Sequence, residues 1–337
     1  MGLGNVLDPP VWRAMKSQQN KLVEKFEVAV AQRVSRLVTG QEAAVLAAVS
    51  GGADSMALVA ALARTRVRSV EAVVVDHGLR EESTAEAEAV RRAVEGLGVR
   101  CEVRALALER GPGVEARARA ARYAALEEVR VARGLAVVAT GHTASDQSET
   151  VLMRLARGAA LGGAAGILAR REDAVVRPLL FATREDVHAY TAALGLATVA
   201  DPMNRDRQFL RVRVRLDALP ALEAAAGPGV ARALARFAAF AAEDDAHLAE
   251  EAAAALDAAR VEGGLRWDKV EALAGPLRRR ALAAFLAEAE LPVDAELLED
   301  VLAAVAARRT ATLPKDKLLA CEGGLLRVVP APPRKAR

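Results

Sequence analysis

The sequence predicts an α/β protein with a parallel doubly wound sheet, followed by a smaller helical domain with a short β tail. Three observations indicate this class. Short apolar runs alternate with helix-length segments in the first half of the chain, a glycine-rich turn ends the first run, and Ala and Leu become more frequent after about residue 217. Apolar strands that alternate with helices are typical of a parallel sheet covered on both faces.

The expected strands cover residues 43–49, 70–76, 99–106 and 135–141, with a fifth at 174–180. Helices are expected at 21–38, 54–65, 83–97, 114–133, 145–157 and 184–194. In such sheets, ligands bind beyond the carboxyl ends of the strands. The turns that follow the strands are therefore the first place to look for a site.

The second half of the chain has a different pattern. Segments 229–260, 266–288 and 293–308 are rich in Ala and Leu, which favours helices. Alternating apolar and polar residues around Gly323-Gly324 predict a hairpin. We therefore expect four parts: an N-terminal helical extension at 1–42, the α/β domain at 43–217, a helical domain with a β tail at 218–328, and a basic Pro-rich tail at 329–337.

Composition excludes several classes of protein. A chain of 337 residues that is 53% hydrophobic and 27% charged is globular and long enough for two or three domains. The net charge is only +3 and most cations are Arg, so contact with nucleic acid must come from local Arg clusters. Cys101 and Cys321 lack CxxC spacing, which argues against a zinc or iron–sulfur site. Without a signal-peptide pattern or a membrane-length apolar run, we expect a cytoplasmic protein with no membrane partner.

The stretch "VLAAVSGGADSMAL", residues 45–58, carries the strongest chemical signal. A strand that turns through glycines into a helix presents backbone N–H groups and a positive dipole end, which suit a phosphate. A P-loop would need a Lys here, and a dinucleotide fingerprint would need its third glycine at Ser55. An ordinary tight turn accounts for Gly51 and Gly52, but less readily for Ser50, Asp54 and Ser55 around them.

These residues resemble the SGGxDS signature of the PP-loop ATP pyrophosphatase superfamily, whose fold is of the adenine nucleotide alpha hydrolase type. The resemblance implies that ATP is cleaved between its α and β phosphates and that an oxygen is adenylated. It also implies nucleotide binding by Ser50, Gly51, Gly52, Asp54 and Ser55. Asp54 would in addition bind Mg²⁺ and act in catalysis.

A second stretch, "GHTASDQSETVLMRLARG" at 141–158, follows a predicted strand. The acidic residues of this stretch could instead be the solvated start of a helix, because the helix dipole favours Asp and Glu in the first turn. Beside the first stretch, however, it resembles the H-x-x-D-D-Q-x-E-T…R-G segment of the tRNA(Ile)-lysidine synthetase family. Ser145 stands where the family has the first Asp, so catalysis and Mg²⁺ binding are carried over to Asp146 alone. His142 and Glu149 are implied nucleotide-binding residues, and Arg154 completes the match.

Three further stretches are similar to the same family in order. They are "VVVDHGLREES" with His77 and Arg80, "GVEARARAARYAAL" with Glu115, Arg119, Arg122 and Tyr123, and "DPMNRDRQFLRVRVR" with Asp201, Pro202, Asn204, Arg211 and Arg215. Val212 replaces the usual Asn of the last motif. Arg122 is the implied catalytic Arg near the α-phosphate. The resemblance covers residues 43–217 and is weak over 218–337, where the family places its tRNA-binding parts.

The Arg residues near position 211 have a helical spacing. Arg207, Arg211 and Arg215 recur every fourth residue and would form one stripe on a helix. Stacked cations repel unless an anion or carboxylates lie opposite. The stripe is either a solvated basic face or a contact with tRNA phosphates or ATP. His77 and His142 are likewise open between direct catalysis and the role of ordinary strand-end histidines, and the latter is favoured.

The resemblance implies a ligase that forms a carbon–nitrogen bond. ATP would adenylate C2–O of the wobble cytidine in a CAU-anticodon isoleucine tRNA, and L-lysine would then displace AMP. ATP and Mg²⁺ are the implied cofactors, and Asp146 could instead be the base for the lysine amine.

Two alternatives to this function are another PP-loop enzyme, such as a tRNA thiolase or an amidotransferase, and a non-catalytic RNA-binding protein. The intact Ser50–Ser55 loop argues against the latter, and the absence of a CxxC pair argues against iron–sulfur-dependent thiolases. A homodimer, the lysine site and anticodon recognition stay open.

Overall fold

The computed structural model describes residues 9–40, 44–66, 68–76, 78, 83–106, 111, 113–199 and 206–332. The predictions on His77, Arg80, Asp201, Pro202 and Asn204, and on the side chain of Glu115, lie outside the described residues. The chain divides into two compact units, Met1–Phe240 and Ala241–Arg337. This boundary falls inside the predicted 218–328 domain, and the functional division at 217/218 stays a prediction.

The first unit contains a five-stranded sheet. Its strands are β1 (Val45–Val49), β2 (Val70–Asp76), β3 (Arg100–Ala105), β4 (Val137–Ala139) and β5 (Val175–Val176). They run in the order β3-β2-β1-β4-β5, and every neighbouring pair is parallel. The predicted parallel doubly wound sheet is confirmed.

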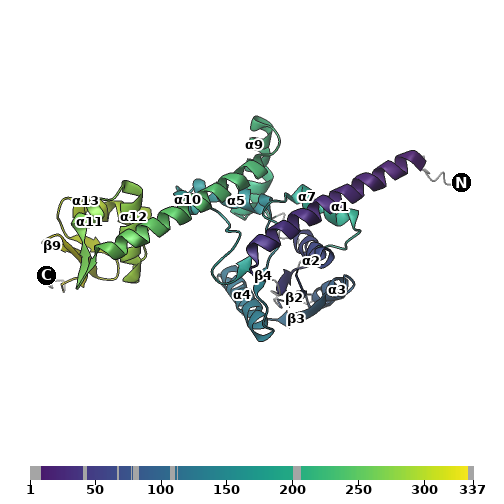
Figure 1. Cartoon of the computed structure of the whole chain (residues 1–337), viewed down its shortest axis with the longest axis horizontal. Coiled ribbons are helices and arrows are strands. Elements are labelled where there is room, and N and C mark those ends of the chain that lie inside the picture. Colours follow the sequence, from purple (N-terminus) through teal and green to yellow (C-terminus); the bar gives the residue numbers. More distant parts are fainter. Residues whose placement is uncertain are drawn as a thin grey trace. The chain divides into compact units, whose positions relative to one another are not determined.

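Helices cover both faces of this sheet (Figure 1). One core cluster joins alternate strand residues to the four helices α1 (Pro9–Leu37), α2 (Ala53–Thr65), α3 (Ser83–Glu95) and α7 (Arg184–Ala193). The other strand residues, such as Leu46 and Val138, pack against α4 (Val114–Ala132). Right-handed crossovers require this change of face when the chain reverses direction after β3. The reversal places a ligand crevice between the ends of β1 and β4.

Helix α1 is anchored by its apolar stripe. Val23, Phe26, Val30 and Val34 recur at helical spacing and are all buried in the core of the first unit. The ring of Phe26 stacks on that of Tyr190 in α7 with a centroid distance of 4.2 Å. The helix predicted over 21–38 is confirmed and begins earlier, at Pro9.

The prediction of a strand over 174–180 is wrong in its length. β5 contains only Val175 and Val176. Pro178 has no N–H with which to continue a ladder, and the N–H of Arg177 donates instead to the carbonyl of Ala169 at 2.9 Å. The following helix α7 agrees with the predicted 184–194.

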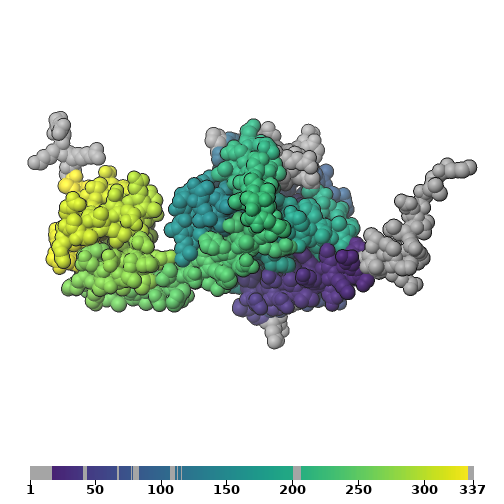
Figure 2. Space-filling model, turned by 90° about the horizontal axis from the view of Figure 1, so that it is seen from above, coloured from purple at the N-terminus to yellow at the C-terminus, as the bar shows by residue number. Residues whose placement is uncertain are grey.

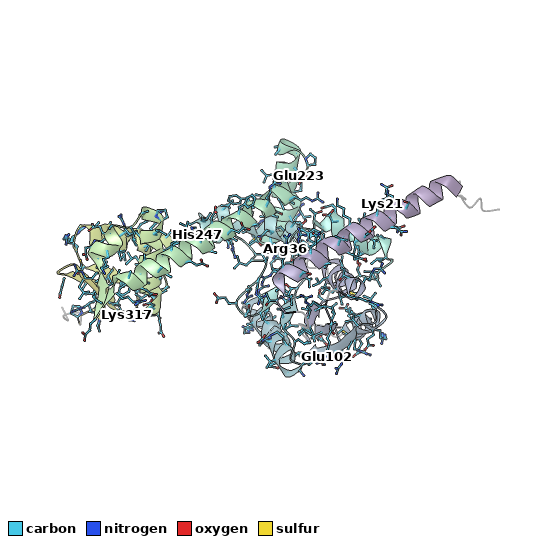
Figure 3. The ribbon with its side chains drawn as sticks, in the orientation of Figure 1. Lys21, Arg36, Glu102, Glu223, His247 and Lys317 are labelled. Atoms are coloured by element: carbon cyan, nitrogen blue, oxygen red, sulfur yellow. The ribbon has the colours of Figure 1, made fainter. Side chains whose placement is uncertain are left out.

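A series of helices leads out of the sheet region. α5 (Ala144–Leu155) and α6 (Leu161–Ala164) precede β5, whereas α8 (Leu210–Arg213), the π-helix η2 (Val214–Ala218) and α9 (Leu219–Ala226) follow α7. Helix α9, which carries the labelled Glu223, has no buried residue and projects from the first unit (Figures 1, 2 and 3). The long helix α10 (Val230–Ala259) includes the residues on both sides of the 240/241 boundary.

The second unit has its own core and sheet. Its elements are β6 (Arg260–Val261), β7 (Gly264–Arg266), α11 (Trp267–Glu271), α12 (Gly275–Glu288), α13 (Ala295–Ala306), β8 (Ala311–Leu313), β9 (Lys317–Glu322) and β10 (Leu325–Pro330). The five strands follow the order β6-β7-β10-β9-β8. Trp267, Leu282, Leu319 and Leu326 are buried between sheet and helices.

Two predictions for this unit have different outcomes. The hairpin around Gly323-Gly324 is confirmed, since β9 and β10 pair antiparallel and both glycines have positive φ. The segment 266–288, predicted to be helical, contains two helices, because Gly275 and Pro276 begin a new helix after α11. Throughout the described part of the chain, every helix is too short or too polar to cross a membrane.

Candidate nucleotide site

The loop between β1 and α2 strongly favours glycine at its first turn. Gly51 has φ +81°, and a Cβ there would lie 2.5 Å from Cγ2 of Val90. Gly52 is the N-cap residue of α2, and no side chain caps this helix. The N–H groups at the start of α2 are therefore suited to an anionic ligand.

Hydroxyl groups close this loop on itself. The N–H of Ser50 donates to Oγ of Ser55 at 3.1 Å, and the two serine hydroxyls are 3.3 Å apart. Oγ of Ser55 also donates to the carbonyl of Gly52 at 3.0 Å. Ser50, Gly51, Gly52 and Ser55 thus lie in one tight turn at the switch point. Nucleotide binding by these four residues stays a prediction.

Gly141 brings the loop after β4 against the start of α2. A Cβ at Gly141 would lie 2.9 Å from the carbonyl carbon and oxygen of Asp54 and 3.0 Å from the N of Ser55. These are backbone atoms that cannot move aside. The sequence analysis placed Gly141 at a strand end and gave it no role. A close contact between two backbone segments far apart in the sequence cannot be recognised from the sequence, apart from the presence of the glycine.

Asp146 is held by the capping box of α5. Its Oδ2 accepts hydrogen bonds from N and Oγ1 of Thr143, both at 2.9 Å, and its Oδ1 accepts one from Nη2 of Arg211 at 2.9 Å. Burial raises the pKa of Asp146, but Arg211, the Thr143 hydrogen bonds and His142 outweigh burial and lower it. The residue is both an acidic helix start and an ionised carboxylate at the crevice.

Asp54 carries an unsatisfied carboxylate oxygen beside Asp146. Its Oδ1 is buried and has no hydrogen-bond partner among the described residues. Burial and the charge of Asp146 raise the pKa of Asp54 to about 6, against the opposing charges of Arg184, His188 and Arg215. Two neighbouring carboxylates with one free buried oxygen fit Mg²⁺, which commonly takes one or two carboxylates plus substrate phosphates. The described residues hold no group of three or more His, Cys, Asp or Glu that could bind a metal unaided.

Glu149 is fully buried and paired with arginines from another segment. Nε of Arg215 and Nε of Arg211 each lie 2.6 Å from one of its oxygens, and Nη1 of Arg184 lies 3.7 Å away. A carboxylate therefore lies opposite Arg211 and Arg215 of the predicted stripe. The interpretation as a solvated basic face is wrong for Arg215, whose side chain is only 17% exposed. Arg207 precedes α8 and pairs with Asp217 at 3.1 Å, so it does not join this face.

The two departures from the family motifs have structural roles here. Oγ of Ser145 accepts a hydrogen bond from N of Arg184 at 3.0 Å and so contacts the first turn of α7. Val212 is buried in the first unit, so an apolar side chain replaces the polar group expected there. Arg154 donates to the carbonyls of Gly163 and Gly166 and supports the loop after α5.

His142 and Arg122 lie on the α4 side of this region. Nδ1 of His142 is 2.9 Å from Oγ1 of Thr140. Burial, with the charges of Arg177, Arg119 and Arg211, lowers the pKa of His142 to about 4 although Asp146 opposes them. The imidazole is therefore neutral near pH 7. Arg122 has its guanidinium 5.5 Å from the ring centre of Tyr123 rather than in contact with Asp54 or Asp146.

Sequence reasoning missed Arg184, His188 and Arg177. Arg184 and His188 belong to α7 and influence Asp54 electrostatically, while Arg177 follows β5 and influences His142. The capping box of Thr183 and Asp186 marks the start of α7 in the sequence. It does not indicate that this helix end lies beside Asp54.

The fold and this site define an ATP-binding protein of the PP-loop class, and residues 22–222 match the PP-loop domain family. A U34-tRNA thiolase from Methanococcus maripaludis shares the fold, with a TM-score of 0.55 at 19% identity over 66% of this chain and 80% of the thiolase. The tRNA(Ile)-lysidine synthase of Salinispora arenicola is 47% identical over 71% of this chain and 74% of its own length. That of Thermus thermophilus is 41% identical over 85% of this chain and 57% of its own. The chain belongs to the tRNA(Ile)-lysidine synthase family and is an enzyme of the ligase type.

Replacing Asp54 by Asn should stabilise the protein without Mg²⁺. The folded pKa of about 6 lies above the ordinary 3.8, so the ionised form destabilises the fold near neutral pH. We expect a gain of about 1–2 kcal/mol at pH 7, which vanishes as the pH falls from about 6 to about 4. Thermal melts across this range test it, and Mg²⁺ should raise the melting temperature of the wild type more than that of Asp54→Asn. A variant less stable at every pH would contradict the assignment.

Replacing Glu149 by Gln should destabilise the first unit strongly. The change removes the buried carboxylate that pairs with Arg211 and Arg215; Arg211 keeps Asp146, but breaking a buried ion pair of the kind that Arg215 makes costs about 3–5 kcal/mol. Urea denaturation followed by circular dichroism measures the loss. Glu128→Gln is the matched control, because this carboxylate is 69% exposed and 3.5 Å from Arg104, and its loss should be small. Equal effects of the two changes would refute the buried ion-pair network.

Replacing Gly141 by Ala should impair both folding and ATP binding. The added methyl would meet the backbone of Asp54, and overpacking of this kind costs about 1–3 kcal/mol. We expect a lower melting temperature and weaker ATP binding in equilibrium dialysis. Gly275→Ala is the control, because a Cβ there meets nothing closer than Arg279 Nη1 at 3.8 Å. Wild-type ATP affinity in Gly141→Ala would show that the loop contact does not shape the site.

Proposed function

We propose that this enzyme joins L-lysine to C2 of the wobble cytidine in an isoleucine tRNA with a CAU anticodon. One ATP is converted to AMP and pyrophosphate for each lysine added. The observation that carries the proposal is the unpartnered buried oxygen of Asp54 beside Asp146, at the uncapped start of α2. Relatives named tRNA(Ile)-lysidine synthase support the substrate.

In the first step, O2 of the cytidine attacks the α-phosphorus of ATP, and the bond from that phosphorus to the bridging oxygen of pyrophosphate breaks. The Ser50–Ser55 loop and the start of α2 bind the departing phosphates through N–H and O–H donors. Arg122 stabilises negative charge on the α-phosphate. Asp54 and Asp146 would hold Mg²⁺, which when bound neutralises charge on the phosphates.

In the second step, the ε-amine of lysine attacks C2, the C2–O bond breaks, and AMP leaves. The attacking nitrogen must lose protons to a base or to water. Asp146 is a weak base because its pKa is lowered, so we assign it to binding Mg²⁺ rather than to proton transfer. Neutral His142 lies beside Asp146 and can hydrogen-bond the nucleotide without adding charge.

Selection of the tRNA requires contacts beyond the anticodon, because the methionine tRNA carries the same CAU triplet. We assign these contacts to residues 218–337, nearly all of which follow the PP-loop domain. A cytoplasmic location follows from a tRNA substrate, and a homodimer stays a prediction.

Labelled lysine, ATP and Mg²⁺ supplied with transcripts of the two CAU tRNAs test the proposal. We expect label in the isoleucine tRNA alone, with one AMP and one pyrophosphate formed per lysine, because transfer needs both an activated cytidine and a bound amine. Asp54→Ala should abolish the label. AMP formation without lysine transfer to either tRNA would overturn the lysidine assignment and leave a PP-loop enzyme of another specificity.

A further inference from the structure

Four arginines surround one tyrosine on the α4 side of the sheet. We call this group the Tyr123 cluster: Tyr123 with Arg119 and Arg122 from α4 and Arg171 and Arg177 from the segment around β5. The guanidinium carbons of Arg119, Arg122 and Arg171 lie 5.1, 5.5 and 5.2 Å from the ring centre. Nη2 of Arg119 also donates to the tyrosine hydroxyl at 3.5 Å.

The positive charge of the Tyr123 cluster lacks carboxylate partners. In the described part of the chain, Asp173 pairs with Arg171 at 2.7 Å, and no carboxylate pairs with Arg119, Arg122 or Arg177. Arg177 is only 4% exposed, and its Nε is buried without a hydrogen-bond partner. Burial and the charge of Arg119 lower the pKa of both Arg122 and Arg177, although Tyr123 opposes this. Buried like charges of this kind are stable when an anion binds them.

The position of the cluster separates it from the phosphate-binding turn. Tyr123 packs against the core that contains Leu46 and Val138, whereas α2 packs against the opposite face of the same sheet. The charges of Arg119 and Arg177 nevertheless act on His142, which stands next to Asp146. A ligand bound by Arg119, Arg171 and Arg177 would therefore reach the crevice from the α4 side, whereas the departing phosphates of ATP are held from the α2 side. Arg122, which is assigned to the α-phosphate, is left out of this ligand set.

The residue types favour RNA over a simple anion. Guanidinium groups bind phosphate through paired hydrogen bonds, and an aromatic ring flanked by arginines offers stacking surfaces for unpaired bases. An anticodon loop supplies both groups on a single strand. We propose that the Tyr123 cluster binds a phosphodiester of the anticodon loop next to the modified cytidine, with Arg119, Arg171 and Arg177 as its ligands.

This inference rests on the proposed function, and its test needs neither lysine nor turnover. Binding of a CAU-anticodon isoleucine tRNA transcript is measured from about 50 to 200 mM KCl for the wild type and for Arg119→Gln/Arg171→Gln. Each lost phosphate contact in a single strand lowers the slope of log K against log salt by about 0.7, so we expect a decrease of about 1.4. Arg119→Lys/Arg171→Lys should keep most of the slope because the charge is retained.

The matched control is Arg92→Gln/Arg100→Gln, which removes two exposed arginines from α3 and β3 and should leave the slope nearly unchanged. The phosphate that the cluster binds could also come from ATP. Equilibrium dialysis tests this, and the ATP affinity of Arg119→Gln/Arg171→Gln should equal that of the wild type. An unchanged slope, an equal decrease in the control, or a loss of ATP affinity instead would each overturn the site. Failure of the wild type to transfer lysine would refute the proposed function and leave this measurement interpretable.

Discussion

The arrangement of the site depends on three carboxylates that are taken out of water at one end of the sheet. Asp54 and Asp146 lie in the first turns of α2 and α5, and Glu149 lies further along α5. Burial of such groups is costly unless they are paired. Arg211 and Arg215 supply the pairing for Glu149 and Asp146 from a segment more than 60 residues away. The ion pairs therefore attach α8 and η2 to α5 and give the crevice one of its walls.

The fold was predictable where apolar runs of strand length alternate with segments of helix length. Alternating apolar strands and helices specified the parallel sheet, and the change of face that accompanies the chain reversal after β3 follows from the handedness of crossovers. Strands of two or three residues, such as β5, β6 and β8, carry too few residues for a period to show. In 266–288 the Ala- and Leu-rich composition indicates helix but does not show where α11 ends and α12 begins.

The site was predictable only where one segment contains the chemistry. Residues 50–55 combine turn glycines with hydroxyl and carboxylate groups, and the four-residue spacing of Arg211 and Arg215 places both on one face. Their partners could not be predicted, because Glu149 meets them through tertiary packing alone. The same holds for Gly141, whose close approach to Asp54 joins the loop after β4 to the start of α2, and for Arg177, which reaches the Tyr123 cluster from the β5 segment.

The charged groups of the site differ in how completely the protein itself pairs them. Glu149 has two arginines at 2.6 Å and is satisfied by the protein itself, so it contributes to the folded structure before any substrate binds. Asp54 and the Tyr123 cluster are incompletely paired, with a buried carboxylate oxygen in one and a buried guanidinium nitrogen in the other. A group that the protein leaves unpaired gains more from a ligand of opposite charge than a paired group does. A cation at Asp54 and an anion at Tyr123 would each relieve one of these deficits, from opposite faces of a single sheet.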